Sequence, residues 1–349
     1  VYALQEFLNQ YDNVNAYILD YRSEIIEEKY KCMYCLKQKG SLIKKIGRLI
    51  LNGTSICKRN YVFERERNCY FKIREKNIKK DQLQKIATRY QAIITGSDQV
   101  WNQEITGGDK AYFLDFVRSP QKKYAYAASM GTVSLNKPEL EEIELLLDDF
   151  NAVSVREEKL AKNLEAFTNK KRIDCVLDPV FLMNGAYWRK ISLYKKRKPY
   201  VLFFMMGNSE SALPAMNFAK KIASLYGWEV IFLSDQERWY KYRDVTHFGV
   251  ASPAEFVGLI DHAEYVITNS FHATAFSIIL HKEFWVETEV LRNERISNLL
   301  RNFELAYRGL KKGIPHDTQE QINWNEVDNK IEIMRSKSKK FLDEIISDL

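Results

Sequence analysis

Short apolar runs alternate with amphipathic segments along most of the sequence, and this alternation limits the fold more than any other feature. The apolar runs predict strands at residues 92–95, 123–127, 152–155, 200–205, 229–233, 265–268 and 284–287. Between them, apolar residues at helical spacing predict helices at residues 140–150, 157–167, 211–226, 253–260 and 271–280. Strands that alternate with helices form a parallel sheet covered by helices, because a parallel neighbour needs a crossover connection. The sequence therefore predicts the α/β class.

The length of 349 residues and the breaks in this alternation predict two domains. A further strand is expected at residues 15–20, and residues 22–90 are expected to be a basic, mostly helical insertion in the first domain. Regular structure ends near Asp178-Pro179, because proline restricts the residue before it. The predicted parts are an N-terminal domain, a linker without a sustained period, a C-terminal domain and a helix that packs back on the first domain, over residues 1–180, 181–198, 199–315 and 316–349.

The formal net charge of +7 at pH 7 favours anionic partners, but it does not choose among phosphorylated substrates, nucleic acid and an acidic membrane surface. Such charge is most often the solvated face of helices, and that interpretation is favoured over contact with a polyanion or with lipid headgroups. The basic clusters of the insertion lie at Lys37, Lys39, Lys44, Lys45, Lys58, Arg59, Lys79 and Lys80.

Cysteine content and hydropathy indicate a cytoplasmic protein. No run of about 18 apolar residues is present, so no segment is expected to span a membrane. The odd number and low density of cysteines favour a reducing compartment. Cys32 and Cys35 offer two zinc ligands, but Cys57 and Cys69 are too far apart to form a second close pair, so free thiols are favoured.

The segment around His272 is the most informative candidate site. An apolar strand at residues 265–268 runs into Asn269-Ser270-Phe271-His272, and an apolar helix leaves on the far side. His272 is therefore expected at a strand-to-helix corner, where backbone N–H groups at the helix start favour anions. The alternative is a buried histidine that a neighbouring carbonyl satisfies.

A second candidate follows the strand at residues 92–95, where the sequence continues Gly96-Ser-Asp-Gln-Val-Trp-Asn102. Gly96 permits a tight turn, and Asp98 can accept hydrogen bonds from hydroxyl groups. Trp101 offers a face either to a sugar ring or to the core. The competing interpretation is a turn in which the aspartate caps a helix.

Two arginine segments also follow predicted strands. Arg156 ends the run Val153-Ser-Val-Arg156, where its planar fork can meet a carboxylate or a phosphate. An ordinary ion pair with Glu157 or Glu158 is the favoured alternative. Arg295 begins an amphipathic helix, where a positive charge opposes the helix dipole, and this conflict indicates another partner such as a bound anion.

Several signatures of other enzyme classes are absent from the sequence. It has no Gly-x-Gly-x-x-Gly after a strand, no Walker loop, no Gly-x-Ser-x-Gly elbow and no His-Glu-x-x-His. Dinucleotide-dependent oxidoreductase, P-loop and zinc protease functions therefore lose their main support.

Six segments in order resemble the polysaccharide pyruvyl transferase family and extend over about residues 90 to 300. They are Ile94-Thr-Gly-Ser-Asp-Gln-Val-Trp-Asn102, Tyr124-Ala-Tyr-Ala-Ala-Ser129, Val153-Ser-Val-Arg-Glu157, Leu177-Asp-Pro-Val-Phe181, Ala254-Glu-Phe256 with Leu259-Ile260, and Thr268-Asn-Ser-Phe-His-Ala-Thr-Ala-Phe-Ser277. The resemblance implies two Rossmann-like domains in a GT-B-like arrangement with an interdomain cleft. It also implies transfer of pyruvate from phosphoenolpyruvate onto saccharide hydroxyls.

The resemblance also implies roles for an arginine matching Arg156, a histidine matching His272 and a basic residue downstream, for which Arg295 is the best match and Arg292 a substitute. His272 is the expected general acid or base, and Asp98 is placed with it in the catalytic site as a group that positions the acceptor. Ser270, Trp101 and Asn102 are expected to bind substrate together with the arginines. Ala273 departs from the glycine usual after the histidine, and Glu283 departs from the proline that commonly follows Lys282. The family's glycine-containing loop before the first helix does not occur in residues 1–349.

The expected partners are phosphoenolpyruvate and a saccharide or lipid-linked oligosaccharide, without nucleic acid, metal or cofactor. The protein is expected in the cytoplasm, with peripheral contact with the inner membrane face left open, and the oligomeric state cannot be predicted. Two other functions compete with pyruvyl transfer. One is a GT-B glycosyltransferase that uses a nucleotide sugar. The other is a non-enzymatic polyanion-binding protein that relies on the basic insertion.

Overall fold

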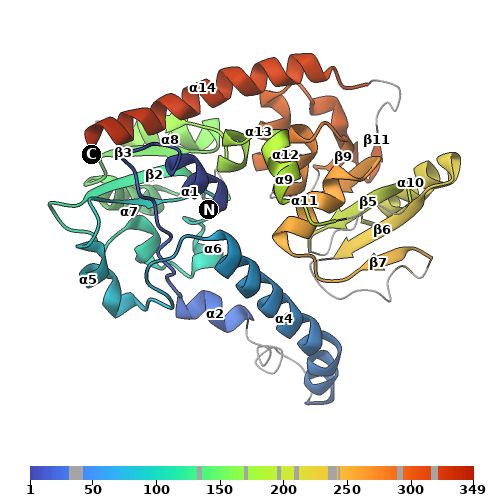
Figure 1. Cartoon of the computed structure of the whole chain (residues 1–349), viewed down its shortest axis with the longest axis horizontal. Coiled ribbons are helices and arrows are strands. Elements are labelled where there is room, and N and C mark those ends of the chain that lie inside the picture. The colour runs from blue at the N-terminus through green and yellow to red at the C-terminus, as the bar shows by residue number, and fades with distance from the viewer. Residues whose placement is uncertain are drawn as a thin grey trace. The chain divides into compact units, whose positions relative to one another are not determined.

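The computed structural model describes the chain except for residues 31–41, 132–135, 169–171, 195–197, 208–211, 235–241, 243, 289–293 and 316–320. The chain divides into two compact units (Figure 1), one with a parallel sheet and one with a sheet that is parallel except at one edge strand. Unit 1 comprises Val1–Lys29, Tyr70–Met183 and Asn329–Leu349, and unit 2 comprises Tyr30–Cys69 and Asn184–Asp328. The basic insertion, which the sequence placed in the first domain, is therefore grouped largely with unit 2.

Unit 1 is built on a four-stranded parallel sheet in the order β1-β2-β3-β4. The strands are β1 (Ala92–Thr95), β2 (Lys122–Ala128), β3 (Ala152–Val155) and β4 (Ile173–Cys175). The helices of this unit are α1 (Tyr2–Leu8), α2 (Glu24–Tyr30), η1 (Lys80–Gln82), α5 (Leu83–Ala87), α6 (Gln103–Thr106), η2 (Lys110–Phe113), α7 (Lys137–Leu147), α8 (Glu158–Phe167), η3 (Pro179–Leu182) and most of α14 (Trp324–Asp348).

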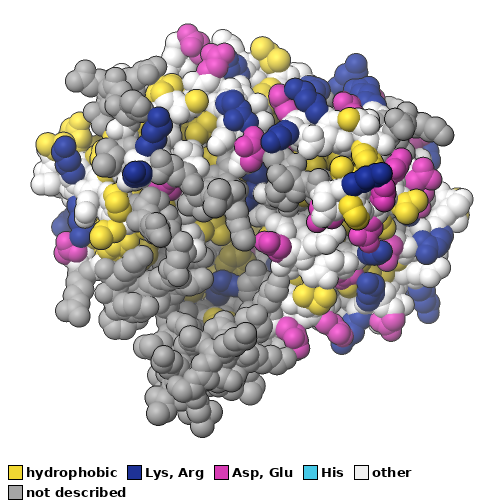
Figure 2. Space-filling view, turned by 180° about the vertical axis from the view of Figure 1, so that it is seen from behind, with side chains coloured by type: hydrophobic (Ala, Val, Ile, Leu, Met, Phe, Trp, Pro, Cys, Tyr) yellow, Lys and Arg dark blue, Asp and Glu magenta, His cyan; other side chains and the backbone are white. Residues whose placement is uncertain are grey.

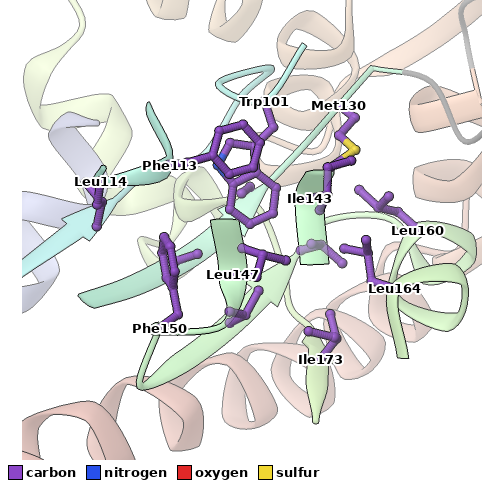
Figure 3. Close-up of a cluster of buried hydrophobic side chains, with 14 of the residues drawn as sticks. Trp101, Phe113, Leu114, Met130, Ile143, Leu147, Phe150, Leu160, Leu164 and Ile173 are labelled. Carbon is purple, nitrogen blue, oxygen red and sulfur yellow. The ribbon is translucent and has the colours of Figure 1, made fainter. Parts of the chain in front are cut away.

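The core of unit 1 lies between this sheet and its helices (Figure 3). Helix α7 contributes Ile143 and Leu147, and α8 contributes Leu160 and Leu164, each pair spaced by four residues and therefore on one helix face. Trp101 stacks on Phe113 with ring centroids 5.0 Å apart (Figure 3). The buried apolar positions of α7 and α8 thus face the sheet, whereas Leu145 of α7 is 79% exposed.

The C-terminal part of α14 is tied to unit 1 by polar contacts at three places (Figure 1). Arg335 Nε donates to the Phe181 carbonyl over 2.6 Å, and the Leu177 amide donates to Ser338 Oγ over 2.9 Å. The Tyr124 hydroxyl donates to Asp348. These contacts hold the helix beside β2 and beside the segment that follows β4.

Unit 2 is built on a seven-stranded sheet in the order β11-β10-β9-β8-β5-β6-β7. All neighbours are parallel except β11, which pairs antiparallel with β10. The strands are β5 (Tyr200–Met205), β6 (Glu229–Ser234), β7 (Thr246–Phe248), β8 (Tyr265–Thr268), β9 (Glu283–Glu287), β10 (Gly309–Lys311) and β11 (Ile314–Pro315). The six parallel strands follow the Rossmann order 3-2-1-4-5-6 in reverse, so the strand order changes direction between β5 and β8.

The helices of unit 2 are α4 (Leu42–Tyr70), α9 (Gly185–Ile191), α10 (Ala212–Tyr226), α11 (Pro253–Asp261), α12 (Phe271–Ile279), α13 (Glu294–Asn302) and η5 (Ala306–Arg308). Helix α9 lies in the segment 181–198 that the sequence analysis treats as a linker. That prediction is wrong for this helix, because Trp188 is buried and packs edge-on against Phe276, with centroids 4.9 Å apart. Among the described residues, no helix is long and apolar enough to cross a membrane.

Two other predictions need correction. The strand expected at residues 15–20 is reduced to isolated bridges, in which Ile18 pairs with Ile73 and Tyr21 with Ile78, so no continuous ladder forms. Cys57 is disulfide-bonded, contrary to the expectation of free thiols, whereas Cys69 and Cys175 are free. Burial raises the pKa of Cys175 to about 12, so this thiol stays protonated and unreactive. Cys32 and Cys35, the proposed zinc pair, lie outside the described residues.

Candidate functional site

The first candidate region is the carboxyl edge of the unit 2 sheet, where the strand order reverses between β5 and β8. Ligands of open α/β sheets bind at such a point, because the loops after the two strands leave in opposite directions. The Asn269 side chain joins the two strand ends: Oδ1 accepts from the Met206 amide over 2.7 Å, and Nδ2 donates to the Met206 carbonyl over 3.0 Å. Gly207 follows with φ of +68°, a conformation that favours glycine.

Helix α12 begins at this edge, and its first turn is fixed by local hydrogen bonds. Ser270 is the N-cap residue, and its hydroxyl accepts from the Ala273 amide over 3.4 Å. The Ser270 amide donates to Thr268 Oγ1 over 3.0 Å, and the Thr274 hydroxyl donates to the Ser270 carbonyl over 2.9 Å. Ser270 is 5% exposed. Its role in this geometry is to cap α12, and its assignment to substrate binding stays a prediction.

Phe271 brings His272 and Arg295 to one place. The His272 ring meets Phe271 edge-on with centroids 5.4 Å apart, and the Arg295 guanidinium lies over the Phe271 ring 6.0 Å from its centroid. Phe271 is buried, whereas His272 and Arg295 are each half-buried. An imidazole and a guanidinium from two helices of unit 2 therefore share an aromatic support at the start of α12. Arg292, the substitute for Arg295, lies outside the described residues.

The second candidate region is the carboxyl edge of the unit 1 sheet, with Arg156 at its centre. Arg156 is 4% exposed, and its Nη1 donates to Asp178 Oδ2 over 2.6 Å. Its Nε lies 3.5 Å from Glu157 Oε1, and its Nη2 lies 3.7 Å from Asp98 Oδ1. The guanidinium therefore meets carboxylates of its own unit: the ion pair with Glu157 that the sequence offered as an alternative is present, and Asp178 is the nearer partner. A ligand would have to compete with Asp178 for it.

Burial alone would lower the pKa of Arg156, but the negative charges of Asp178, Glu157 and Asp98 outweigh burial and raise that pKa. The guanidinium is therefore charged at any pH at which the protein folds. Burial raises the pKa of the Tyr126 phenol on β2, and nearby Asp178 raises it further, so this hydroxyl stays neutral.

Hydroxyl groups complete this cluster, and sequence reasoning did not assign them a role. Ser97 Oγ donates to Asp178 Oδ2 over 2.8 Å, and Ser129 Oγ donates to Glu157 Oε1 over 2.6 Å. Each residue follows a different strand of the four-stranded sheet, so the strand-end position was the signal that could have identified them.

Asp98 differs from the rest of the cluster. Its side chain is 59% exposed, and its backbone has φ of +76°, which an aspartate adopts at some energetic cost. The Asp98 carbonyl accepts from the Ser129 amide over 3.0 Å, which holds this conformation. The Asp98 backbone is thus fixed at the sheet edge while its carboxylate is exposed, and its role in holding an acceptor stays a prediction.

Asn102 and Trp101 have structural roles in this geometry. Asn102 Oδ1 accepts from the Glu104 amide over 3.0 Å and so caps α6, while its Nδ2 donates to Gln99 Oε1 over 2.7 Å. Trp101 is 2% exposed, and its Nε1 donates to the Tyr112 carbonyl over 3.0 Å. Of the two interpretations of Trp101, the core contact is the one that the structure supports, because no ring face is available to a sugar.

Across the part of the chain that the structure describes, no three His, Cys, Asp or Glu side chains are grouped so as to hold a metal ion. The expectation that the reaction needs no metal or cofactor stays an expectation.

Comparison with known proteins gives the family. Residues 1–287 match the polysaccharide pyruvyl transferase family. The chain belongs to this family. The match includes Ser97, Arg156 and His272 and ends at Glu287, the last residue of β9, so Arg295 lies beyond it. Membership makes the protein a transferase of polysaccharide biosynthesis with a saccharide acceptor. No curated protein matches the chain.

One solved structure supports the fold of this family member, and a second is reported beside it. The UDP-GlcNAc 2-epimerase of Neisseria meningitidis bound to UDP-GlcNAc aligns with a TM-score of 0.51 and 10% identity, over 99% of this chain and 95% of that chain. The UDP-GlcNAc 2-epimerase of Methanocaldococcus jannaschii, in complex with UDP-GlcNAc and UDP, aligns with a TM-score of 0.45 and 13% identity, over 82% and 88%. The first of these is of the GT-B type, and the predicted class of two Rossmann-like domains is confirmed.

Proposed function

We propose that this pyruvyl transferase moves pyruvate from phosphoenolpyruvate onto two hydroxyls of a saccharide, as a cyclic ketal, and releases phosphate. The observation that carries the proposal is the pairing of His272 and Arg295 on Phe271 at the start of α12. This pair lies in the unit whose strand order reverses at the same sheet edge.

The chemistry of the donor fits the groups at this edge. Phosphoenolpyruvate has a phosphate and a carboxylate, so its site needs fixed cations and N–H donors. The Arg295 guanidinium supplies the cation in unit 2. The Phe271 and His272 amides lie in the first turn of a nine-residue helix, where N–H groups and the helix dipole favour an anion.

The proposed reaction begins with proton transfer to the terminal CH₂ carbon of the enol, C3, which makes C2 electron-deficient. One saccharide hydroxyl then forms a bond to C2 and loses its proton, and the C2–O bond to phosphate breaks. The second hydroxyl closes the ring at C2 and loses its proton to the departing phosphate. One proton thus ends on the new methyl group and one on phosphate, so the reaction is balanced without another reactant.

His272 is the proposed general acid and base, because an imidazole exchanges a proton near neutral pH. A helix N-terminus lowers the proton affinity of a histidine, whereas a bound phosphate raises it. Donor binding therefore helps to protonate the ring before the enol carbon needs the proton. General acid–base catalysis of this kind typically contributes about 10²- to 10⁴-fold in rate.

Unit 1 is proposed to hold the acceptor. The exposed Asp98 carboxylate can accept hydrogen bonds from saccharide hydroxyls, and its fixed backbone gives these bonds a defined direction. Arg156 is carried over from the family as a substrate-binding cation, which requires exchange of Asp178 for the substrate. The acceptor is a saccharide or a lipid-linked oligosaccharide, and the reaction is proposed to take place in the cytoplasm.

The test is phosphate release together with mass analysis of candidate bacterial glycans incubated with phosphoenolpyruvate. His272→Asn should lower phosphate release about 10²- to 10⁴-fold while donor binding stays nearly unchanged. His281→Asn is the matched control, because His281 is partly exposed and pairs with Asp328 through its Nε2, 2.8 Å away. Near-normal turnover by His272→Asn would refute the assigned role.

The second candidate is a GT-B glycosyltransferase, since the same strand reversal also suits a nucleotide. Titration of the protein with UDP-sugars and with phosphoenolpyruvate separates the two candidates. Saturable binding of a UDP-sugar without binding of phosphoenolpyruvate would favour the glycosyltransferase.

A further inference from the structure

Gln99 is a half-buried side chain at the carboxyl edge of the unit 1 sheet, in the loop that follows β1. A chain of hydrogen bonds fixes the direction of its carboxamide. The Glu104 amide can only donate, so Asn102 turns its Oδ1 toward that amide, 3.0 Å away. Asn102 therefore presents Nδ2 to Gln99, whose Oε1 accepts over 2.7 Å. The donor end of the Gln99 carboxamide, Nε2, is consequently directed away from Asn102.

Gly131, three residues after the end of β2, provides the space in which this carboxamide lies. Its φ of +72° favours glycine. A Cβ added at this position would overlap Gln99 Oε1 and would lie 2.7 Å from Asn102 Nδ2. The Gln99 carboxamide therefore packs directly on the glycine backbone, and any larger residue at position 131 would displace it.

Ser129 joins this arrangement to the surroundings of Arg156. It is fully buried, and its amide donates to the Asp98 carbonyl over 3.0 Å. Its Oγ accepts from the Gly131 amide over 3.1 Å and donates to Glu157 Oε1 over 2.6 Å. The segments that follow β1, β2 and β3 are thus held together through one hydroxyl group and one amide, so the carboxamide belongs to the same sheet edge as Arg156.

The formal charge of this edge indicates the class of ligand that it suits. Carboxylate oxygens of three residues lie within 3.7 Å of the Arg156 guanidinium nitrogens, so these four side chains together have a charge of −2; the three are Asp98, Glu157 and Asp178. The whole chain has a net charge of +7, but Figure 2 shows basic and acidic side chains interspersed on the face that it draws, so local charge decides. A negative edge repels a phosphorylated carboxylate and suits a neutral ligand with hydroxyl groups. The saccharide acceptor of the family is such a ligand.

We propose that Gln99 is an acceptor-binding residue whose Nε2 donates to a hydroxyl oxygen of the saccharide, and that Gly131 is the residue that positions it. The proposal rests on the proposed function and deepens it, because Asp98 is proposed to hold the same saccharide. The Asp98 carboxylate only accepts hydrogen bonds, whereas Nε2 has two N–H groups and only donates. Two consecutive residues therefore offer both kinds of partner to saccharide hydroxyls, which donate and accept.

The first test measures ketal formation from phosphoenolpyruvate on candidate bacterial glycans, with each substrate varied in turn. Gln99→Ala should raise the KM for the glycan about 3- to 10-fold, the range expected for one neutral hydrogen bond, and leave the KM for phosphoenolpyruvate unchanged. The matched control is Gln103→Ala, because Gln103 is exposed on α6 and should affect neither KM. An unchanged KM for the glycan, or an equal rise in both KM values, would overturn the proposal.

The second test displaces the carboxamide without removing it. Gly131→Ala puts a methyl group where the Gln99 carboxamide lies, so the KM for the glycan should rise as it does in Gln99→Ala. Gly108→Ala is the control, because Gly108 has φ of +73° and an added Cβ there meets nothing within 4 Å. Both glycine variants force alanine into a positive φ and should lower the midpoint of denaturant unfolding alike. A rise in the KM for the glycan in both glycine variants, or in neither, would overturn the positioning role.

A double variant shows whether Gly131 acts through Gln99. When the carboxamide is already absent, as in Gln99→Ala, the further change Gly131→Ala should raise the KM for the glycan by less than about twofold. If the two changes instead multiply their separate effects on this KM, Gly131 acts through the fold and not through Gln99, and the positioning role is overturned.

Binding of the same glycans without phosphoenolpyruvate keeps this inference distinct from the catalytic one. Calorimetric titration should show weaker binding to Gln99→Ala than to the wild type, by the same factor as the rise in KM. Absence of ketal formation by the wild type would refute the proposed function, and weaker glycan binding by Gln99→Ala would then still support the acceptor role. Equal glycan binding by the two proteins would overturn that role whether or not a ketal forms.

Discussion

The carboxyl edges of the two sheets place an arginine in different surroundings. In unit 1 the central cation, Arg156, is buried and meets Asp178, Glu157 and Asp98. In unit 2 the corresponding cation, Arg295, is half-buried and lies over an aromatic ring beside His272. Both arginines belong to segments that the sequence marks as candidates. The difference indicates that a cation at a strand end can be held among carboxylates of its own unit or over an aromatic ring.

The largest effect should come from removing the buried cation. Arg156→Met leaves Asp178 and Glu157 buried without their positive partner, so we expect a loss of about 3–5 kcal/mol in the free energy of unfolding. Denaturant titration measures it. Arg172→Met is the control, because Arg172 pairs with Asp174 at 2.7 Å but is 68% exposed, and exposed pairs contribute about 0–1 kcal/mol. Similar losses of unfolding free energy in Arg156→Met and Arg172→Met would show that burial of Arg156 does not make its ion pairs more important for stability.

The opposite result is expected for the cation of unit 2. Arg295→Met should weaken binding of phosphoenolpyruvate about 10- to 100-fold, since a hydrogen bond to a charged group contributes about 1.5–3 kcal/mol. Its free energy of unfolding should fall by less than that of Arg156→Met, because Arg295 is half-buried whereas Arg156 is 4% exposed. Calorimetric titration and denaturant unfolding give the two numbers. A loss of stability as large as that of Arg156→Met would show that the arginines at the two sheet edges contribute to folding alike.

As the pH is lowered, unit 1 should lose its folded structure before unit 2 does. Burial alone would raise the pKa of Asp109, but hydrogen bonds from Tyr21 and Lys80 outweigh it and lower the pKa. Lys122 and Tyr124 likewise lower the pKa of Asp348. A lowered folded pKa gives stability that is fully present above the ordinary value of about 3.9 and is lost as pH falls through the folded value.

In unit 2, among the described residues, the carboxylate whose pKa is resolved as lowered is Asp244, which is exposed and contributes little. Hydrogen exchange between pH 5 and pH 2.5 should therefore show amides around β1 and β2 losing protection before those around β5 and β8. Asp109→Asn should reduce the difference between the pH values at which the amides of the two units lose protection. Loss of protection in unit 2 first would contradict the assignment.

The smallest effect concerns the backbone at Asp98. Asp98→Gly removes the cost of a positive φ and should raise the free energy of unfolding by up to about 1 kcal/mol, while it lowers activity with a saccharide acceptor. Lys312→Gly is the control, because Lys312 has φ of +50° and is exposed. It should give a similar gain in stability and unchanged turnover. If Asp98→Gly retains full activity, Asp98 does not position the acceptor.

Much of the framework could be predicted because it depends on local apolar runs. The predicted strands at residues 92–95, 152–155 and 265–268 have the same limits as β1, β3 and β8. Strands β7 and β10 were missed, since Thr246–Phe248 and Gly309–Lys311 are three residues long and partly polar. Their strand character comes from pairing with β6 and β9, which the local sequence does not show.

The sequence predicted which positions carry the candidate residues better than it predicted which residues these side chains contact. Placing polar residues at strand ends identified His272, Arg156 and Arg295. The pairing of Arg156 with Asp178 joins residues 22 apart, and that of Ser97 with Asp178 joins residues 81 apart, so tertiary packing decides both. Trp101 is the clearest example of a role that the local sequence does not decide. Its neighbours in the sequence suit a ring that binds a sugar as well as a core residue, and its burial in the structure shows that it is a core residue.

The seven-stranded sheet finishes on one side with β11, two residues long and ending at Pro315. Proline has no N–H to donate, so this margin offers few groups on which another chain could extend the ladder. A protein with many apolar strands thereby limits stacking of its copies into insoluble assemblies. Replacing that proline with valine would restore a donor there and should increase light scattering on concentration.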